Sequence, residues 1–419
     1  MKTSHIKIST VLPSSGTGAV FSIGFKMKIL DNSGWCLEGP QVDHPTDRSI
    51  NSIFEEILTK PGQSDLVALV NAETGVEITF GQLNEQANQL ANILLAKIQR
   101  SGLKPNSDGD NIVAVRFHPG HELVITLLAI FKARLAYVPI APNWPEGRIQ
   151  HILEDSSPIM VITNINARLI YKAQKKTIGG SQQDILQYED LVNEALATKA
   201  STKNLGKKEI HDLGNTLYAV LYTSGSTGQP RGVRHVHKAA LNRISWQWNV
   251  FPYEEDEVCV FKTTLTFIDS VIEIWAPLLS GLRLVILPTK VTDNVERFVE
   301  ALELYRIRRI FVVTSLVRSI LAYLNLDSER ARKRLQNVKI WECSAETVTK
   351  EVLLDFFAYF GSGHRISNFY GSTEMSDVTF DTFTSSQEVL AVLCEDKVIS
   401  LQSFDGSHTL TSLFGSLDR

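Results

Sequence analysis

A strand followed at once by a loop of glycines and hydroxyl residues is the feature that most restricts how this chain can fold. The apolar run of residues 217–221 predicts a buried strand, and residues 222–233 then carry four Ser or Thr hydroxyls and three glycines. Glycine permits tight bends, so the backbone N–H groups of such a loop can converge on an anion. The hydroxyls and the forked guanidinium of Arg231 add donors for phosphate oxygens. We therefore expect this loop to bind a polyphosphate.

Other interpretations of this loop are weaker. A solvated Ser/Thr/Gly turn would explain any four of its residues, but it does not explain twelve in this order. The Walker phosphate loop is excluded, because no Gly-Lys-Ser/Thr follows the required four-residue gap. The residues of the loop that we expect to hold the nucleotide are Thr223, Ser224, Gly225, Ser226, Thr227 and Gly228.

A second motif, at residues 368–374, also suits a nucleotide. The ring of Tyr370 can stack on adenine, and Gly371 allows the backbone to approach a ligand closely. The Thr373 hydroxyl can bond to the α-phosphate, and the Glu374 carboxylate can ligate Mg²⁺. Taken alone, the same heptad is compatible with a strand end and a turn.

Together, in this order and at this separation, the two motifs resemble the signatures of the adenylate-forming enzymes. This superfamily contains the acyl-CoA synthetases, the luciferases and the adenylation domains of peptide synthetases. The resemblance implies that ATP is the nucleotide, that Thr373, Glu374 and Arg231 act in catalysis, and that Glu374 ligates Mg²⁺. The further nucleotide-binding residues that it implies are Asn368, Tyr370, Gly371, Ser372, Ala345 and Glu346.

Four positions depart from the pattern of these enzymes. Arg231 replaces the usual Lys of the phosphate loop, which keeps the charge but changes its shape. Ala345 replaces the Gly of a Ser-Gly-Glu segment, and a methyl group there can weaken ligand binding if the backbone needs a positive φ. Arg134 and Leu135 replace a Gly-Gly pair, so we expect some loss of stability or a shifted loop at that point.

Several other segments resemble one branch of the superfamily, the β-alanyl-amine synthetases, which join β-alanine to dopamine, histamine and related amines. They comprise residues 103–110, residues 241–248 with 251–253, and residues 261–270. None of them is a general requirement of the superfamily. The likeness therefore implies β-alanine as the activated acid and a biogenic amine as the acceptor.

The position of one carboxylate gives this substrate a physical reason. Adenylation domains for α-amino acids commonly hold the substrate ammonium with an Asp directly after a Phe, whereas here Ile268 follows Phe267 and Asp269 comes next. β-Alanine carries its ammonium one methylene further from its carboxylate, so a displaced counter-ion suits it. The alternative is an Asp that caps a turn before the apolar run of residues 271–275. The residues expected to line the substrate pocket are Phe267, Asp269, Ser344 and Phe369.

The implied chemistry has two stages. The β-alanine carboxylate attacks the α-phosphorus of ATP, and the resulting acyl-adenylate passes to a phosphopantetheine thiol on a carrier domain and then to the amine. We can place neither the carrier site nor the ribose-binding Asp nor the Lys of the C-terminal lid in this sequence. We therefore expect a truncated chain with the C-terminal lid domain absent, in which catalysis is incomplete.

The chain divides into three expected regions. Residues 1–45 are divergent and are predicted to be disordered, residues 46–392 form an AMP-binding adenylation core, and residues 393–419 form an unmatched tail.

Within the core, short β-branched runs alternate with helical patterns, which indicates parallel α/β units. The runs are residues 284–287 and 310–313, and the helical patterns are residues 295–305 and 316–324. We expect an α/β fold of two packed subdomains with ATP between them, as in the N-terminal core of adenylate-forming enzymes.

Composition restricts the partners and the compartment. The formal charge of −4 argues against nucleic acid as a partner. The four cysteines are scattered and show no paired metal spacing, so a cytoplasmic location is the simplest interpretation. The apolar N-terminal stretch of residues 16–25 is too short and too glycine-rich for a signal peptide or a membrane span.

Two other functions stay open at this point. The first is an acyl-CoA synthetase-like enzyme for another acid, in which a carboxylate such as Asp269 would be unnecessary. The second is a catalytically dead remnant that binds nucleotide, and ATP binding without pyrophosphate exchange would identify it.

Overall fold

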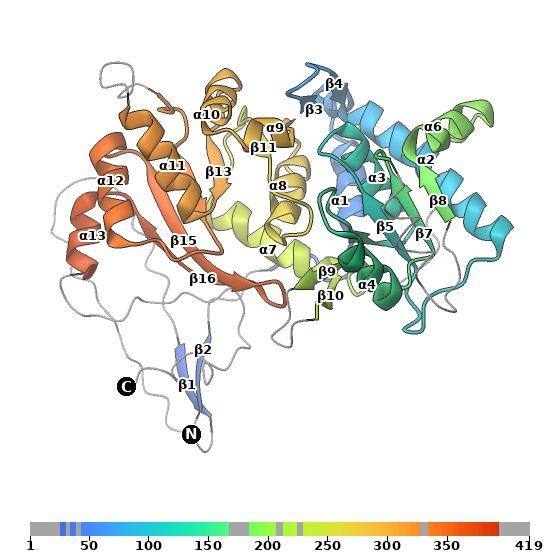
Figure 1. Cartoon of the computed structure of the whole chain (residues 1–419), viewed down its shortest axis with the longest axis horizontal. Helices are drawn as coiled ribbons and strands as arrows, with labels where there is room; N and C mark the ends of the chain where they lie inside the picture. Colours follow the sequence, from blue (N-terminus) through green and yellow to red (C-terminus); the bar gives the residue numbers. More distant parts are fainter. Residues whose placement is uncertain are drawn as a thin grey trace.

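The computed structural model describes residues 26–30, 34–38, 43–166, 184–206, 213–223, 229–326 and 334–393. Figure 1 shows two α/β lobes, with α7 and α8 between them. The phosphate-loop residues Ser224, Gly225, Ser226, Thr227 and Gly228 lie outside the described residues, as does the expected tail beyond residue 393.

The first lobe is built on a six-stranded sheet of order β10-β9-β6-β5-β7-β8. Its neighbouring strands are parallel except for β10, which runs antiparallel to β9. Strands β5, β6 and β7 are buried at every residue, as expected where helices cover both faces of a parallel sheet. The strands are β5 (Ile112–Arg116), β6 (Ala136–Pro139), β7 (Met160–Thr163), β8 (Asp184–Gln187), β9 (Leu217–Thr223) and β10 (Arg231–Val236).

Two four-stranded sheets complete the main body, with the orders β11-β12-β3-β4 and β13-β14-β15-β16. In the second of these, β13, β14 and β15 are parallel and β16 returns antiparallel to β15. The strands are β3 (Val67–Asn71), β4 (Glu77–Thr79), β11 (Cys259–Phe261), β12 (Leu284–Ile286), β13 (Arg309–Val312), β14 (Ile340–Cys343), β15 (Arg365–Ser372) and β16 (Ser376–Phe383). A separate hairpin of β1 (Lys26–Leu30) and β2 (Gly34–Glu38) lies within the N-terminal region that the sequence predicts to be disordered.

The helices alternate with these strands along the chain. In the first lobe they are α1 (Ile50–Ile57), α2 (Phe80–Ser101), α3 (His121–Lys132), α4 (Glu146–Ser156) and α6 (Tyr188–Ala197). Those that follow are α7 (His237–Val250), α8 (Asp269–Leu278), α9 (Thr289–Thr292), α10 (Val295–Leu304), α11 (Thr314–Asn325), α12 (Lys350–Phe360) and α13 (Ser386–Leu393). A short 3-10 helix, η1, covers Gln63–Asp65.

Each lobe has its own apolar core. In the first, the buried rings of Phe131 and Trp275 pack with their centroids 5.3 Å apart. In the second, Trp341 of β14 packs on Phe356 of α12 with 5.4 Å between the centroids. The prediction of two packed α/β subdomains is therefore confirmed.

The predicted elements are found close to their expected bounds. The strands expected at 217–221, 284–287 and 310–313 are β9, β12 and β13, and the two helical patterns are α10 and α11. At the Gly-Gly departure, Arg134 adopts a φ of 59°, a conformation that glycine would hold without strain.

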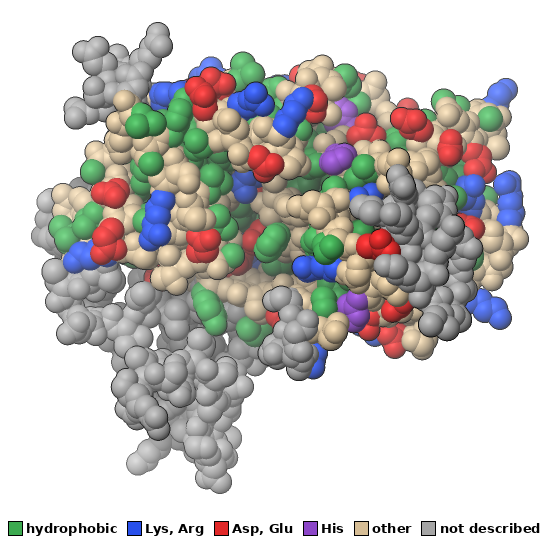
Figure 2. Space-filling view, in the orientation of Figure 1, with side chains coloured by type: hydrophobic (Ala, Val, Ile, Leu, Met, Phe, Trp, Pro, Cys, Tyr) green, Lys and Arg blue, Asp and Glu red, His purple; other side chains and the backbone are tan. Residues whose placement is uncertain are grey.

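The surface shows no strong segregation of charge on the face in view. Figure 2 shows Lys and Arg side chains interspersed with Asp and Glu side chains over the described part of that face, in keeping with the small net charge. Among the described residues, no helix has the length and apolar character needed to span a membrane.

Candidate functional site

A pocket with a volume of about 120 Å³ lies where β9 and β10, α7, the start of α8 and the β15–β16 hairpin meet. It brings Glu374 of the second motif beside Ile268, which directly precedes Asp269. The residues that line it are Tyr218, His235, Ala239, Ala240, Asn242, Arg243, Ile268, Val271, Ile272, Glu374, Met375, Ser376 and Asp377. Segments more than 100 residues apart in sequence therefore share one cavity.

The β15–β16 hairpin presents the second motif. Gly371 lies so close to the returning strand that a Cβ atom there would be 2.1 Å from the backbone oxygen of Ser376. Only glycine fits this contact, so the close approach expected at Gly371 is made to the chain itself. Ser372 pairs with Ser376, and the turn between them carries the half-buried Thr373 and the exposed Glu374.

Asp269 and Ser344 meet although they are 75 residues apart. Asp269 is the first residue of α8, and Ser344 directly follows β14. The Ser344 hydroxyl donates to Oδ2 of Asp269 at 2.9 Å. Burial raises the pKa of Asp269 to about 6, and the nearby Asp377 carboxylate adds to this, while the Ser344 bond and Arg243 oppose it. A carboxylate in such surroundings gains more from a cationic ligand than an exposed one does.

Two charged groups behind this pair were missed by the sequence analysis. Arg243 of α7 and Asp377 of β16 are both buried, and Nε of the arginine donates to Oδ2 of the aspartate at 2.8 Å. Nη1 of Arg243 also donates to Oε1 of Gln247, one turn further along α7, at 2.8 Å. The one signal available in the sequence was the i, i+4 spacing of two polar residues on a helix that is otherwise apolar on that face.

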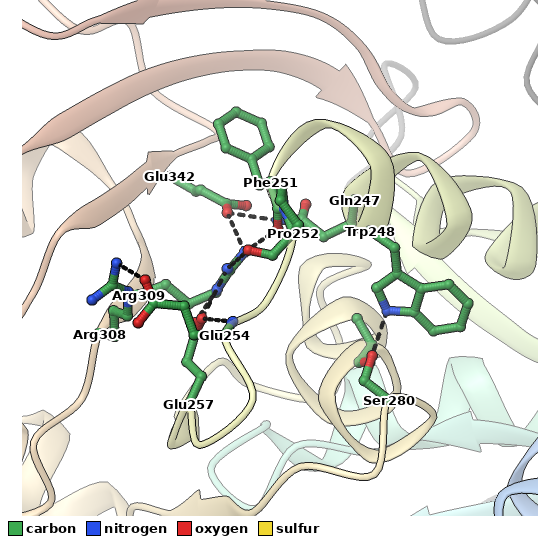
Figure 3. A network of polar contacts seen from close by, with 11 residues as sticks. Gln247, Trp248, Phe251, Pro252, Glu254, Glu257, Ser280, Arg308, Arg309 and Glu342 are labelled. Carbon is green, nitrogen blue, oxygen red and sulfur yellow. Dashed lines mark hydrogen bonds and ion pairs between the residues drawn. The ribbon is translucent and has the colours of Figure 1, made fainter. Parts of the chain in front are cut away.

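The polar network continues away from the pocket, as Figure 3 shows. Gln247 donates to Oε1 of the fully buried Glu342 at 2.7 Å, and Arg309 lies 3.7 Å from the same oxygen. Arg309 also donates to the backbone oxygen of Phe251 at 2.9 Å and forms an ion pair with Glu257. Burial raises the pKa of Glu342 to about 7, although Arg309 and Arg243 oppose the shift. The network joins α7 to β13 and β14 behind the pocket.

The ends of the phosphate loop are held by the β9–β10 ladder. Thr223 and Arg231 are register partners across this antiparallel pair, and the Arg231 side chain is exposed. The hydroxyl of Tyr222 donates to Oδ2 of Asp155 in α4 at 2.5 Å. The pKa of Tyr222 is raised by burial and by that carboxylate. The structure thus fixes where the loop leaves and re-enters the sheet.

In the Ser-Ala-Glu segment after β14, the backbone adopts a conformation that suits glycine better than alanine. Ala345 adopts a φ of 65°, in the left-handed region that favours glycine. The Glu346 carboxylate accepts hydrogen bonds from the backbone N–H of Ser315 at 2.7 Å and from its hydroxyl at 2.9 Å. These bonds hold Glu346 at the N-terminus of α11, which favours a negative charge.

The aromatic residues predicted at the site are in two kinds of surroundings. The side chains of Phe267 and Tyr370 are 56% and 51% exposed, so their ring faces are accessible to a ligand. Phe369 is only 3% exposed and packs against Trp246 and Phe380 in a buried aromatic cluster. Asn368, which precedes it, is half-buried in β15 between Cys343 and Asp381. The contacts of Asn368 and Phe369 with a ligand stay predictions.

The donors at the hairpin turn fit a magnesium ion that is bound together with phosphates. Mg²⁺ prefers oxygen ligands and in phosphate sites commonly takes one or two carboxylates, with phosphate oxygens and water as the rest. Glu374 offers an exposed carboxylate at the pocket rim, and Thr373 beside it offers a hydroxyl. Of the predicted site residues, Glu374 lines the pocket, Thr373 precedes it in the hairpin turn, and Asp269 directly follows the lining residue Ile268 and bonds Ser344. The roles of these residues stay predictions.

Comparison with known proteins gives one family match. A family model described as AMP-binding enzyme matches residues 59–393. The chain is 42% identical over 354 residues to the Beta-alanyl-bioamine nonribosomal peptide synthetase ebony of Drosophila melanogaster. The aligned residues make up 82% of this chain and 39% of that protein. It is also 29% identical over 333 residues to Zwittermicin A synthase ZmaJ of Bacillus cereus. That alignment covers 79% of this chain and 58% of the other protein. The chain thus spans about two fifths and three fifths of the length of these relatives.

Solved structures share the same fold. The N-terminal subdomain of Klebsiella oxytoca NpsA superposes with a TM-score of 0.64 at 22% identity, over 81% of this chain and 79% of that one. The nonribosomal peptide synthetase FmoA3 superposes with a TM-score of 0.69 at 18% identity, over 87% of this chain and 35% of that one.

Proposed function

Because this chain belongs to the AMP-binding enzyme family, the adenylate-forming ligases, we propose that it activates the carboxylate of β-alanine with ATP. In this reaction a carboxylate oxygen attacks the α-phosphorus of ATP. The bond between the α-phosphorus and the bridging oxygen breaks, and pyrophosphate leaves. The product is β-alanyl-adenylate.

The observation that carries the choice of acid is the pair formed by the half-buried Asp269 and the buried Ser344. Asp269 is one residue beyond the position at which α-amino acid-activating domains commonly hold the ammonium, and Ile268 occupies that position here. Its raised pKa reflects poor solvation, which a substrate ammonium would relieve by pairing with the ionised carboxylate. The Drosophila relative, whose name describes it as a β-alanyl-bioamine synthetase, supports the same acid.

The nucleotide would lie toward the hairpin turn. The exposed ring of Tyr370 is suited to stack on adenine, and Thr373 is suited to bond the α-phosphate. Glu374 would ligate Mg²⁺, which when bound neutralises part of the phosphate charge. Arg231 and the loop between β9 and β10 would hold the outer phosphates. The chain's own groups thus orient the acid at one end of the pocket and the nucleotide at the other.

The later steps are proposed from the resemblance to the β-alanyl-amine synthetases, and the name of the Drosophila relative agrees with a β-alanyl group and an amine. The adenylate would acylate a phosphopantetheine thiol with release of AMP, and an amine such as dopamine or histamine would then displace the thiol to form an amide. The buried thiols of Cys259 and Cys343 are unbridged, which suits the reducing conditions of the cytoplasm, where we place this chemistry.

The direct test of the acid is ATP–pyrophosphate exchange by the whole chain with Mg²⁺. β-Alanine, α-alanine, acetate and butanoate would be compared, and ATP binding would be followed by calorimetry. We expect exchange with β-alanine above the other acids. Exchange that favours butanoate would indicate an acyl-CoA synthetase-like enzyme instead, and ATP binding without exchange for any acid would indicate a nucleotide-binding remnant.

The role of Asp269 predicts a selective loss. Asp269→Asn should lower exchange with β-alanine by about 10- to 100-fold, because it removes a buried charge partner of the ammonium. Calorimetric ATP binding should stay within about twofold, since the carboxylate faces the acid rather than the nucleotide. The exposed Asp256→Asn is the matched control and should behave as the unmodified chain. If the Asp269→Asn chain supports the same exchange with β-alanine as the unmodified chain, Asp269 does not bind the substrate ammonium.

A second test of the acid moves the carboxylate from residue 269 to residue 268. The double change Ile268→Asp with Asp269→Ala should shift the exchange preference from β-alanine toward α-alanine, because the counter-ion then occupies the position used for α-amino acids. The measurement is the ratio of the two exchange rates. A ratio that stays the same would show that the displacement of the carboxylate does not select the acid.

A further inference from the structure

The pocket contains a polar group that the motifs do not account for. His235 of β10 is only 7% exposed and is one of the residues that line the cavity. Its Nε2 atom is buried and has no hydrogen-bond partner among the described residues. A buried polar atom without a partner destabilises the folded chain, so such an atom in a residue that lines a pocket favours a ligand that satisfies it.

The surroundings of His235 define the kind of ligand atom that it can meet. Its ring lies 6.0 Å from the ring of Tyr218, centroid to centroid, and Glu374 is the charged group that acts on it most strongly. Burial lowers the pKa of His235 to about 4, although Glu374 opposes this, so the imidazole is neutral at pH 7. A neutral imidazole offers one N–H donor and one acceptor.

The next histidine along the chain shows the structural alternative. His237 begins α7 and is fully enclosed, with its ring centroid 5.2 Å from that of Phe131. Its Nδ1 atom accepts a hydrogen bond from the backbone N–H of Ile50 at 3.3 Å. His237 therefore serves packing, whereas His235 lines a cavity that also holds Glu374 and has a buried Nε2 atom without a partner among the described residues.

The position of Glu374 indicates which part of the bound acid would lie near His235. Under the proposed function, the ammonium of the acid would pair with Asp269, and the reacting carboxyl group would lie toward Glu374 and the α-phosphate. An oxygen of that carboxyl group needs a donor, which the Glu374 carboxylate cannot supply. The neutral donors that line the pocket include Asn242, Ser376 and His235, and of these three His235 has a buried atom without a partner among the described residues.

We propose that His235 is a further substrate-binding residue, whose Nε2–H donates a hydrogen bond to the acyl oxygen of the bound acid and of its adenylate. This inference rests on the proposed function, because it takes an acyl-adenylate as the ligand. It does not depend on which acid is bound, since every acyl group carries this oxygen. The tautomer required has its proton on Nε2.

The experiment compares AMP with three sulfamoyladenosine analogues of the adenylate, which carry β-alanyl, α-alanyl and butanoyl groups. Calorimetry would give the dissociation constants for the whole chain and for His235→Leu, His235→Gln and His237→Asn. His235→Leu should weaken all three acyl analogues by about tenfold and leave AMP unchanged, because only the acyl ligands reach Nε2. His235→Gln keeps an amide N–H donor and should recover most of the affinity.

The outcomes separate this inference from the proposed function. Acyl analogues that bind His235→Leu as tightly as the unmodified chain would overturn it. So would a His235→Gln chain that is as weak as His235→Leu, since the side chain would then act by packing alone. His237→Asn should lower the unfolding midpoint without changing the ratio of acyl to AMP affinity. A preference for the butanoyl analogue in the unmodified chain would instead contradict β-alanine as the acid.

Discussion

At the scale of single residues, Ala345 is a residue whose backbone conformation does not suit its side chain. Its φ of 65° belongs to the left-handed region, which costs an L-residue about 1–2 kcal/mol. Ala345→Gly should raise the free energy of unfolding by about 0.5–1 kcal/mol, because the strain relieved exceeds the entropy that glycine adds to the unfolded chain.

Urea unfolding at pH 7 would measure this change in Ala345. The matched control is Ala197→Gly at the end of α6, where the backbone is helical and glycine should destabilise. If Ala345→Gly lowers the stability as much as Ala197→Gly does, the strain at residue 345 is not real. Because Ala345 adjoins Ser344, which bonds Asp269, a gain in stability accompanied by a change in β-alanine exchange would show that the strained turn also shapes the acid pocket.

The sequence anticipated this residue for a definite reason. An alanine stands where the resemblance implies glycine, and a missing glycine is a local fact that needs no tertiary information. The same argument identified Arg134, which also has a positive φ. The partnership of Asp269 with Ser344 was different: each residue was named from its motif, but the 2.9 Å bond between them depends on how α8 docks against β14.

At the scale of elements, the pairing of Arg243 with Asp377 fixes α7 against β16. Both side chains are buried, and the guanidinium also lies 4.7 Å from the ring centroid of Trp246. Removing one member of a buried ion pair leaves an uncompensated charge in a poorly solvated place. Asp377→Asn should therefore lower the free energy of unfolding by about 3 kcal/mol.

A double-mutant cycle would measure this coupling. Arg243→Met combined with Asp377→Asn should cost less than the sum of the two single changes, because neither charge is then left alone. Additive effects in urea unfolding would show that the two side chains do not stabilise each other. The exposed pair of Lys290 and Glu73 offers a control cycle that should give less than about 1 kcal/mol.

The burial of Arg243 and Asp377 could not be predicted from the sequence, and the reason is physical. Apolar periodicity located β9, β12, β13, α10 and α11, because buried residues repeat with the period of the element that carries them. The same reasoning treats a charged residue on a helix as exposed. Arg243 is buried only because Asp377, 134 residues later, reaches it, and no local pattern encodes that meeting.

At the scale of the whole molecule, buried ionisable groups set two opposing pH dependences. Burial raises the pKa of Glu342 and Asp381 to about 7 and that of Asp269 to about 6, so the stability they support is lost as the pH rises through these values. Burial lowers the pKa of His235 to about 4 and that of His237 to about 3, so their stability is lost as the pH falls. Between pH 4 and 7 the two sets partly cancel, and the unmodified chain alone cannot separate them.

A neutral replacement of Glu342 isolates one contribution. Glutamine resembles the protonated carboxyl group and can still accept from Gln247, but it does not ionise. Well below pH 4.5 Glu342 is protonated in both the folded and the unfolded chain, and the difference in unfolding free energy between Glu342→Gln and the unmodified chain should be constant. As the pH rises from 4.5 to 7 the unfolded carboxyl ionises first, so the difference should move in favour of Glu342→Gln by about 3 kcal/mol and then level off. Urea unfolding at pH 4.5, 6 and 8 would measure it, with the exposed Glu255→Gln as a control that should show no such trend. A difference that is the same at all three pH values would mean that the pKa of Glu342 is not raised in the folded chain, and that Arg309 offsets the effect of burial.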